Sequence, residues 1–252
     1  PASGAPQAPA GQTPASGAAP AGKPMPIPVR AAAPGAGGKP KAVKPPPVTG
    51  PWRFATLLVA PHRLGFFAAM VVLVAASFWW LAVQADRSFG ALGLSATLAP
   101  ITTHAAVMVF GFMPLFFSGF LFTAGPRWLG VPPHKPTQTA PCVVLQTAGW
   151  LLWLAGARTH AGVALGGMAL ALAGLAWMVA LFWQLIFASQ EEDRVHGKTV
   201  GYGGIVGVLS LGGALLALLA QRQDLALLLV RTGLWGFIVV TYVAVAHRMI
   251  PF

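Results

Sequence analysis

The sequence predicts an all-α, polytopic transmembrane helical bundle over residues 51–252, preceded by a disordered Pro/Ala/Gly-rich arm over residues 1–50. Three observations support this fold class. Hydrophobic residues make up 56% of the chain and charged residues only 8%, whereas soluble domains carry about 25% charged residues. The apolar residues gather in six long runs, and most Lys and Arg lie outside these runs. A chain with this pattern belongs in a lipid bilayer.

The arm differs in composition from the rest of the chain. Residues 1–50 contain thirteen prolines and five Lys or Arg, but no acidic and no aromatic residue. Such a segment buries too little apolar surface to offset its ordering entropy. The simpler interpretation is a mobile tether, and the alternative is a basic strip that binds anionic lipid headgroups. The residues of that strip are Lys39, Lys41, Lys44, Arg53 and Arg63.

Each apolar run predicts one membrane-spanning helix, because ~20 residues at a rise of 1.5 Å cross a bilayer. The predicted spans are 64–83, 101–124, 140–157, 161–188, 200–220 and 225–250. The third run is the shortest. Only residues 158–160 separate it from the fourth, so we expect these two spans to form a tight helical hairpin.

Positively charged residues predict the orientation in the membrane. Twelve of the sixteen Lys and Arg lie on the N-terminal side of the predicted bundle, and four lie on the opposite side. This excess predicts a cytoplasmic N-terminus. A nucleic-acid surface gathers cations on one folded face, and here they flank the spans instead. No nucleic-acid partner is therefore expected.

Small residues and one proline predict features inside the bundle. Gly162 and Gly166 are four residues apart, as are Gly203 and Gly207, and such pairs let neighbouring helices approach closely. Pro114 lies in the middle of the second span. Because proline has no N–H to donate, we expect a kink there.

Histidines are the candidate metal ligands, because neutral imidazole commonly binds metals and haem iron. His104 and His247 lie inside predicted spans, and His62 lies just before the first. No two histidines are three or four residues apart, so a metal site must be assembled across helices. The alternative role for each is a hydrogen bond between helices. His134, His160 and His196 are assigned to loops.

Two arginines are candidates for cofactor binding. Arg231 lies in the outer part of the sixth span, where it either reaches the outer headgroups or faces an anion such as a haem propionate. Arg248 follows the candidate ligand His247.

Several kinds of chemistry have no support in the sequence. No carboxylate lies inside a predicted span, so a proton-coupled transport relay has no evident carrier. Phosphate-binding loops, paired catalytic carboxylates and nucleophile elbows are also absent. The single cysteine, Cys142, allows neither an intrachain disulfide nor a thiolate cluster. No catalytic residue is predicted.

Four segments resemble the NnrS family. FGF at 110–112, followed by GFLFTAGPRWLG at 119–130, resembles a second-span signature that reads roughly HAHEMLFGF and then GFLLTAVPNWTG. HRMIPF at 247–252 resembles a block that typically reads HRMIPFF, and PHRLGFF at 61–67 is similar to the family's opening. The resemblance covers residues 55–252 and leaves the arm unaccounted for.

The resemblance implies a bacterial inner-membrane protein with about twelve spans, linked to nitric oxide metabolism and nitrosative stress, with haem and copper content. It also implies that these residues form roughly the N-terminal half. His104 matches the first histidine of HAHEM, but Ala106 and Val107 occupy the positions of its second histidine and its glutamate. His247 and Arg248 match the second block fully. The alternative functions are a metal-free transporter or permease and a scaffold subunit of a respiratory complex.

Overall fold

The computed structural model describes residues 53–90, 93 and 96–250. The arm over residues 1–50 lies outside the described residues, as do its proposed lipid contacts through Lys39, Lys41 and Lys44. Within the described ranges every regular element is helical and no strand occurs. The all-α prediction is therefore confirmed.

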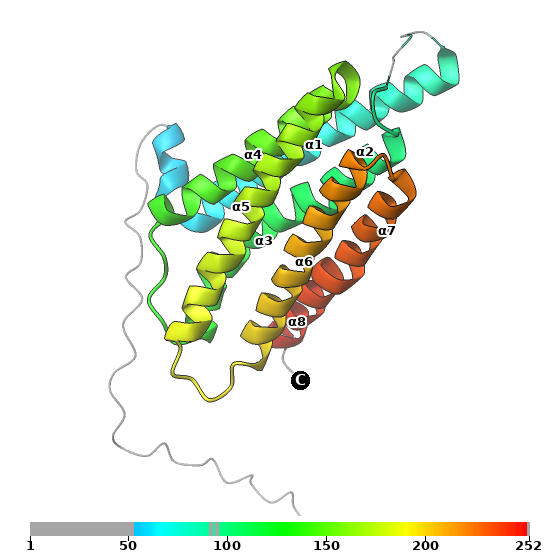
Figure 1. The fold of residues 1–252 in the computed structure, drawn as a ribbon. Helices are drawn as coiled ribbons and strands as arrows, with labels where there is room; N and C mark the ends of the chain where they lie inside the picture. The colour runs from blue at the N-terminus through cyan, green and yellow to red at the C-terminus, as the bar shows by residue number, and fades with distance from the viewer. Residues whose placement is uncertain (1–52, 91–92, 94–95, 251–252) are drawn as a thin grey trace, which may run out of the picture. The chain divides into compact units, whose positions relative to one another are not determined.

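Six helices are long and apolar enough to cross a membrane, which confirms the predicted number of spans (Figure 1). A short 3₁₀ segment, η1 (Phe54–Val59), precedes them. Four spans are single α-helices and two are interrupted by π-helical turns. The single helices are α1 (Pro61–Phe89), α4 (Pro136–Thr159), α5 (Ala161–Ala188) and α6 (Val195–Leu219). The second span is α2 (Pro100–Ala106), η2 (Val107–Phe112) and α3 (Met113–Trp128), and the sixth is α7 (Gln223–Gly233), η3 (Leu234–Val239) and α8 (Val240–Met249).

The ends of the helices follow from local backbone chemistry. Pro61, Pro100 and Pro136 each begin a helix, where the missing N–H of proline costs nothing. Gly90 ends α1 in the left-handed conformation with φ of 62°. Since α4 begins at Pro136, it has 24 residues and is longer than the apolar run at 140–157.

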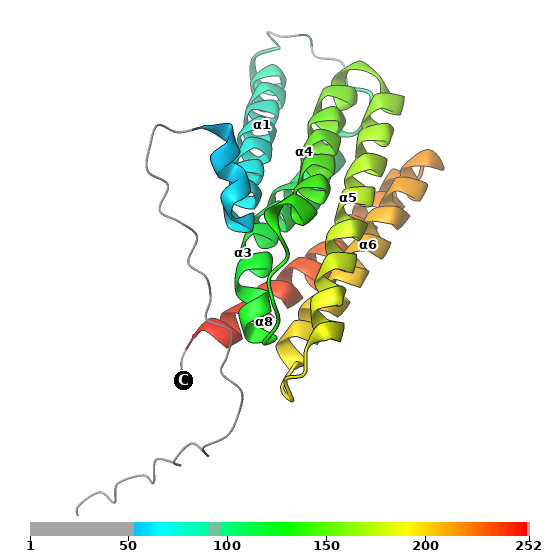
Figure 2. The ribbon, with the colours of Figure 1, turned by 90° about the vertical axis from the view of Figure 1, so that its left-hand side faces the viewer.

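Backbone contact between glycines joins α4 and α5. A Cβ atom on Gly149 would lie 2.5 Å from the carbonyl oxygen of Gly167, and one on Gly174 would lie 2.8 Å from that of Cys142. These two helices lie side by side in both views, as the predicted hairpin requires (Figures 1 and 2). The hairpin prediction is confirmed.

The predicted glycine pairs had different outcomes. A Cβ atom on Gly166 would meet nothing within 4 Å, and one on Gly162 would meet only the ring of His160. Gly162 and Gly166 therefore contact no neighbouring helix, and that prediction was wrong. Gly203 and Gly207 do face the sixth span, where their nearest neighbours include Thr241 and Phe237.

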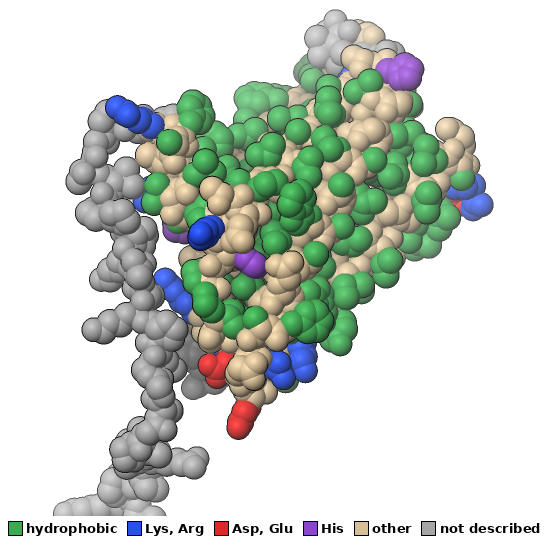
Figure 3. All heavy atoms as spheres, turned by 60° about the vertical axis from the view of Figure 1, so that its left-hand side comes forward, with side chains coloured by type: hydrophobic (Ala, Val, Ile, Leu, Met, Phe, Trp, Pro, Cys, Tyr) green, Lys and Arg blue, Asp and Glu red, His purple; other side chains and the backbone are tan. Residues whose placement is uncertain are grey.

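The other helices pack around this hairpin. α1 contacts α3 and α4, α5 contacts α6, and α6 contacts the three parts of the sixth span. Large apolar side chains point outward from the bundle, including Phe78, Phe187 and Trp235. Hydrophobic side chains cover much of the face in Figure 3, with charged side chains towards its edges. A helix that is apolar on its outer face is typical of a protein surrounded by lipid.

The two π-helical turns lie where the second and sixth spans meet. The ring of Phe110 in η2 packs directly against Gly233, and Phe117 makes an edge contact with Phe237 at 6.4 Å between ring centroids. η2 ends just before Pro114, which cannot donate the hydrogen bond that continues an α-helix. At the position of the predicted kink, the chain thus forms a wider π-helical turn.

The helices of the bundle have their ends on two sides. The N-terminal side is the end that holds residues 53–60, 129–135, 189–194 and 250. The opposite side is the end that holds residues 90, 93, 96–99, 160 and 220–222.

Candidate metal-binding histidines

His104 lies in α2 at the opposite side of the bundle, in the second span. Its imidazole stacks on Trp80 of α1, with ring centroids 4.4 Å apart and planes inclined by 16°. The Nδ1 atom of His104 is buried and has no hydrogen-bond partner among the described residues. A buried nitrogen without a partner costs about 1–3 kcal/mol. One nitrogen of this imidazole is therefore enclosed by the protein and unpartnered within the described residues.

Tryptophans from two other helices surround the same end. Trp153 of α4 donates from Nε1 to the carbonyl oxygen of Thr103, the residue before His104, at 3.1 Å. Trp79 lies beside Trp80. The guanidinium of Arg158 lies over the ring of Trp79, 5.3 Å from the ring centroid. The indole nitrogen of Trp79 is also buried without a hydrogen-bond partner in the described part of the chain. His104 thus lies in a tryptophan-rich and incompletely satisfied polar environment.

His62 lies at the other end of α1, on the N-terminal side. Its Nδ1 atom is 3.5 Å from the hydroxyl of Thr123 in α3, at the long limit for a hydrogen bond. Eighteen residues separate His62 from Trp80, which corresponds to ~27 Å along an α-helix. His62 and His104 are therefore too far apart to bind the same metal ion.

His247 pairs with a histidine that the sequence analysis assigned to a loop. Its Nδ1 atom lies 2.9 Å from Nε2 of His196, and the two rings stack with centroids 5.1 Å apart. His196 belongs to the first turn of α6, and His247 belongs to the last turn of α8. The pair joins two helices that are adjacent in space but 51 residues apart in sequence. No spacing rule within one helix could have found it.

Charged residues surround this histidine pair. Arg248 forms an ion pair with Asp193 at 3.6 Å. The other carboxylate oxygen of Asp193 accepts a hydrogen bond from the backbone N–H of Val195 at 3.2 Å, at the beginning of α6. Arg194 donates to the carbonyl oxygen of Ser189 at 3.1 Å. The loop between α5 and α6 is therefore tied both to itself and to the end of α8.

The two predicted cofactor-binding arginines have different surroundings. Arg248 has the carboxylate of Asp193 as its partner. Arg231 lies exposed in the last turn of α7, and no hydrogen bond or ion pair joins it to another described residue. Its assignment as a counter-charge to an anion stays a prediction.

The remaining histidines have structural contacts. His160 caps α5, because its Nδ1 accepts a hydrogen bond from the backbone N–H of Gly162 at 3.1 Å. The Nε2 atom of His134 lies 3.1 Å from the carbonyl oxygen of Leu181, which ties the loop after α3 to α5.

The structure does not bring the three predicted ligands together. α2, which holds His104, packs against α7, and His247 lies fourteen residues beyond the end of α7, on the order of 20 Å along the helix. Among the described residues, no group of three or more His, Cys, Asp or Glu is close enough to hold a metal ion. Each of His62, His104 and His247 is therefore a separate candidate.

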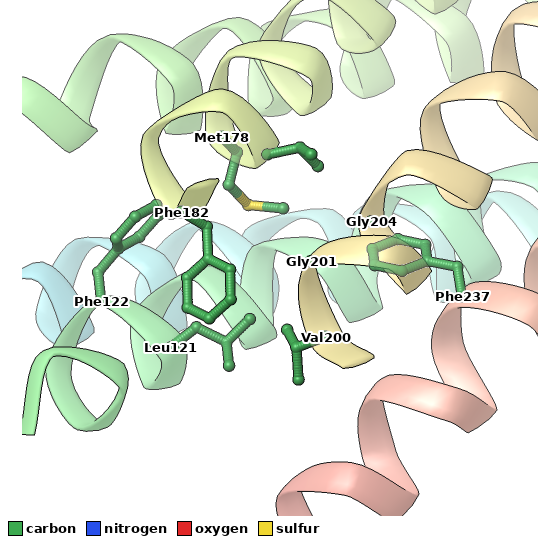
Figure 4. A pocket seen from close by; sticks show the side chains of 9 residues that line it. Leu121, Phe122, Met178, Phe182, Val200, Gly201, Gly204 and Phe237 are labelled. Atoms are coloured by element: carbon green, nitrogen blue, oxygen red, sulfur yellow. The ribbon is translucent and has the colours of Figure 1, made fainter. Parts of the chain in front are cut away.

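A small apolar cavity lies between the second, fourth, fifth and sixth spans. It has about 20 Å³ of free volume, and its lining includes Phe122, Met178 and Phe237 (Figure 4). This volume suits roughly one water-sized molecule and is far too small for a porphyrin. None of the predicted ligands lines it.

Six apolar helices with imidazoles at both ends define a multi-pass membrane protein whose candidate ligands are histidines. The chain belongs to the NnrS family, because the family described as NnrS protein matches residues 56–252. No curated protein and no solved structure matches the chain. The family resemblance seen in the sequence is confirmed.

Proposed function

We propose that this protein is an NnrS-like membrane protein that takes part in nitric oxide metabolism or the response to nitrosative stress, and that it binds haem, copper or both. The observation that carries the proposal is the imidazole of His104, whose buried Nδ1 has no partner among the described residues. It lies within the residues that match the family. Imidazole nitrogen is a common ligand of haem iron and of copper.

The proposed ligands are His104, His247 and His62, at separate positions. His104 offers a buried nitrogen beside tryptophans, and His247 offers an exposed imidazole at the end of α8. Arg231 and Arg248 are the proposed counter-charges to an anionic group on a cofactor. A bound metal would supply a coordination position for a small ligand such as nitric oxide.

The residues fit a metal ion better than they fit a buried haem. The cavity of about 20 Å³ cannot hold a porphyrin, and none of the three proposed ligands lines it. A haem held by His247 would lie at the surface of the bundle, because His247 is exposed. A single metal ion needs only the imidazole nitrogens themselves.

Metal content and absorption spectra of detergent-purified protein test the proposal. We expect a Soret band or bound copper, with a spectrum that shifts when nitric oxide is added under reducing conditions. Replacement of His104 or His247 by alanine should weaken the signal of the site that it serves. The matched control is His134→Ala, since His134 lies in a loop and its imidazole contacts the backbone carbonyl of Leu181 in α5. Well-folded protein without haem or copper would contradict the proposal.

We further propose that the protein lies in a bacterial inner membrane with its N-terminus in the cytoplasm. The support is the excess of Lys and Arg on the N-terminal side, where Arg127, Lys135, Arg194 and Lys198 lie. A reporter active only in the cytoplasm should work when it is fused within 129–135 or 189–194. It should fail within 90–99, and the reverse pattern would invert the proposed orientation.

A permease is the second candidate function. The observation that favours it is a π-helical turn in each of two neighbouring spans, with η2 beside α7 and η3 beside α3. Turns of this kind often occur at functional sites, and interrupted helices form substrate sites in transporters. Substrate-dependent uptake into vesicles, by protein that lacks metal, would favour the permease over the metal-binding function.

A further inference from the structure

We propose that His196 and His247 together form a two-imidazole site for a divalent first-row transition metal ion. The site lies on the N-terminal side, where the beginning of α6 meets the end of α8. This inference deepens the proposed metal-dependent function, and its biological role rests on that function. It adds His196, for which the sequence analysis predicted no ligand role.

The two nitrogens are nearly at the separation that a shared metal requires. His196 Nε2 and His247 Nδ1 are 2.9 Å apart and face one another. Two nitrogens bound tetrahedrally at 2.0–2.1 Å from one metal ion lie about 3.3 Å apart. An opening of about 0.4 Å, together with a tilt of both rings that turns the two nitrogens toward a common point, would convert the hydrogen-bonded pair into a chelating pair. His247 is exposed in the last turn of α8, so its side chain has room for this movement.

The charges near the pair balance, since the acidic residues at 191–193 are matched by Arg194, Lys198 and Arg248, so no net positive charge repels a metal ion. Three of the five acidic residues of the chain, at positions 191–193, directly precede the turn that holds His196. One of them, Asp193, already binds a cation, the guanidinium of Arg248 at 3.6 Å. The imidazoles themselves bind metals in the neutral form, which avoids repulsion between ligand and ion.

The hydrogen bond between the imidazoles leaves His196 incompletely satisfied. Its Nδ1 atom is buried and has no partner among the described residues.

Imidazole ligands suit zinc, copper, nickel and iron. No third His, Cys, Asp or Glu of the described ranges completes the group. A metal bound here would therefore keep positions for water or a small exogenous ligand, as open metal sites do.

Titration of metal-free, full-length protein with Cu²⁺ in detergent tests the site. Cu²⁺ is the probe because it binds nitrogen ligands most tightly among the divalent first-row ions, and its electron paramagnetic resonance spectrum reports bound nitrogens. We expect one of the bound equivalents to show two imidazole nitrogens. His196→Gln and His247→Gln should each weaken binding by at least the roughly 10–100-fold that a lost second-shell partner costs.

Glutamine separates the ligand role from a structural role, because it keeps a hydrogen-bonding side chain and binds metal poorly. His134→Gln is the matched control and should bind Cu²⁺ like the wild type. Helical content and size-exclusion behaviour show whether each variant is folded. Unchanged Cu²⁺ affinity in a folded His196→Gln/His247→Gln double variant would overturn the site, as would a spectrum without two imidazole nitrogens.

The outcomes also separate this site from the proposed function. Absence of a two-imidazole Cu²⁺ signal from the wild-type protein, in protein that does respond to nitric oxide, contradicts this site alone. A two-imidazole Cu²⁺ signal in protein that carries no native metal and does not respond to nitric oxide contradicts the proposed function alone.

Discussion

Two helix–helix contacts in this bundle are built in different ways. Between α4 and α5, backbone lies on backbone, because Gly149 and Gly167 leave no room for a side chain. Between α6 and the sixth span, side chains fill the contact: Gly207 faces the ring of Phe237, and His196 pairs with His247 at one end. A side chain added to the first contact would meet backbone, whereas one added to the second would meet a side chain, which can move.

The difference separates a contact that fixes the fold from a contact that carries the proposed metal ligands. The α4–α5 contact is built on glycine backbone, and Gln146 adds a weak polar contact to Met178 at 3.8 Å. The α6–α8 contact holds two imidazoles and an ion pair, where a shift of a few tenths of an ångström changes what the groups can bind. We therefore expect mutations in the hairpin to change stability, and mutations near α8 to change ligand binding.

The largest effect should come from Gly167→Ala in the hairpin. Its Cβ atom would lie 2.5 Å from the carbonyl oxygen of Gly149 and 2.6 Å from the backbone nitrogen of Trp153. Since backbone cannot swing aside, we expect a loss of about 3 kcal/mol or more in the free energy of unfolding, the upper end of overpacking costs. Thermal or denaturant unfolding in detergent measures it.

The neighbouring glycine supplies the control. Gly166 lies on the same helix, but a Cβ atom there meets nothing within 4 Å. Gly166→Ala should leave stability unchanged or raise it by up to about 1 kcal/mol, the usual gain of alanine over glycine in a helix. Equal effects of the two substitutions would show that the hairpin is not closed by backbone contact.

A smaller loss is expected from Gly207→Ala in α6. Its Cβ atom would lie 2.5 Å from the ring of Phe237, which is a side chain and can rotate. We expect a cost of about 1–2 kcal/mol, within the usual range for overpacking. Gly212→Ala is the matched control, because its Cβ atom would only meet Leu172 at 3.6 Å, an ordinary contact. A cost as large as that of Gly167→Ala would remove the distinction between the two contacts.

The sequence predicts the number of membrane spans better than it predicts the helix ends or the contacts between helices. Hydrophobic runs predict the six spans, because the bilayer demands about 20 apolar residues from each. They do not predict the helix ends, since residues such as Thr137 and Thr199 continue a helix that their polarity seemed to exclude. Which glycines face a neighbour depends on how each helix is rotated, and spacing alone chose Gly166 when Gly167 makes the contact.

The candidate sites show the same limit. His247 could be chosen from the sequence because it lies at the end of an apolar run. Its pairing with His196 could not, because that contact depends on how α6 and α8 are packed. The stacking of His104 on Trp80 likewise depends on the packing of α1 against α2.

The histidine pair itself should contribute modestly and unequally to stability. His247→Ala leaves His196 with both ring nitrogens unpaired, whereas His196→Ala also removes a buried nitrogen that has no partner. We expect His247→Ala to cost about 1 kcal/mol, the net worth of one hydrogen bond, and His196→Ala to cost less. Unfolding of both variants without metal measures the difference, and the opposite order would contradict the pairing geometry.

The smallest effect should come from the ion pair between Arg248 and Asp193. Both side chains are exposed and their charged atoms are 3.6 Å apart. Arg248→Gln should therefore cost less than about 1 kcal/mol, and salt should reduce that cost further because it screens exposed charges. A cost that stays the same between low and high salt would show that the pair is shielded from solvent.

The π-helical turn η3 has a consequence for the distant end of its helix. A π-helix closes its hydrogen bonds one residue later than an α-helix, so η3 takes up extra chain before α8 begins. Each residue turns an α-helix by about 100°. Without that surplus, everything from Val240 onward would rotate about the helix axis, and His247 would point away from His196. A turn near the middle of the sixth span thus determines the direction in which the imidazole of His247 points at the end of that span.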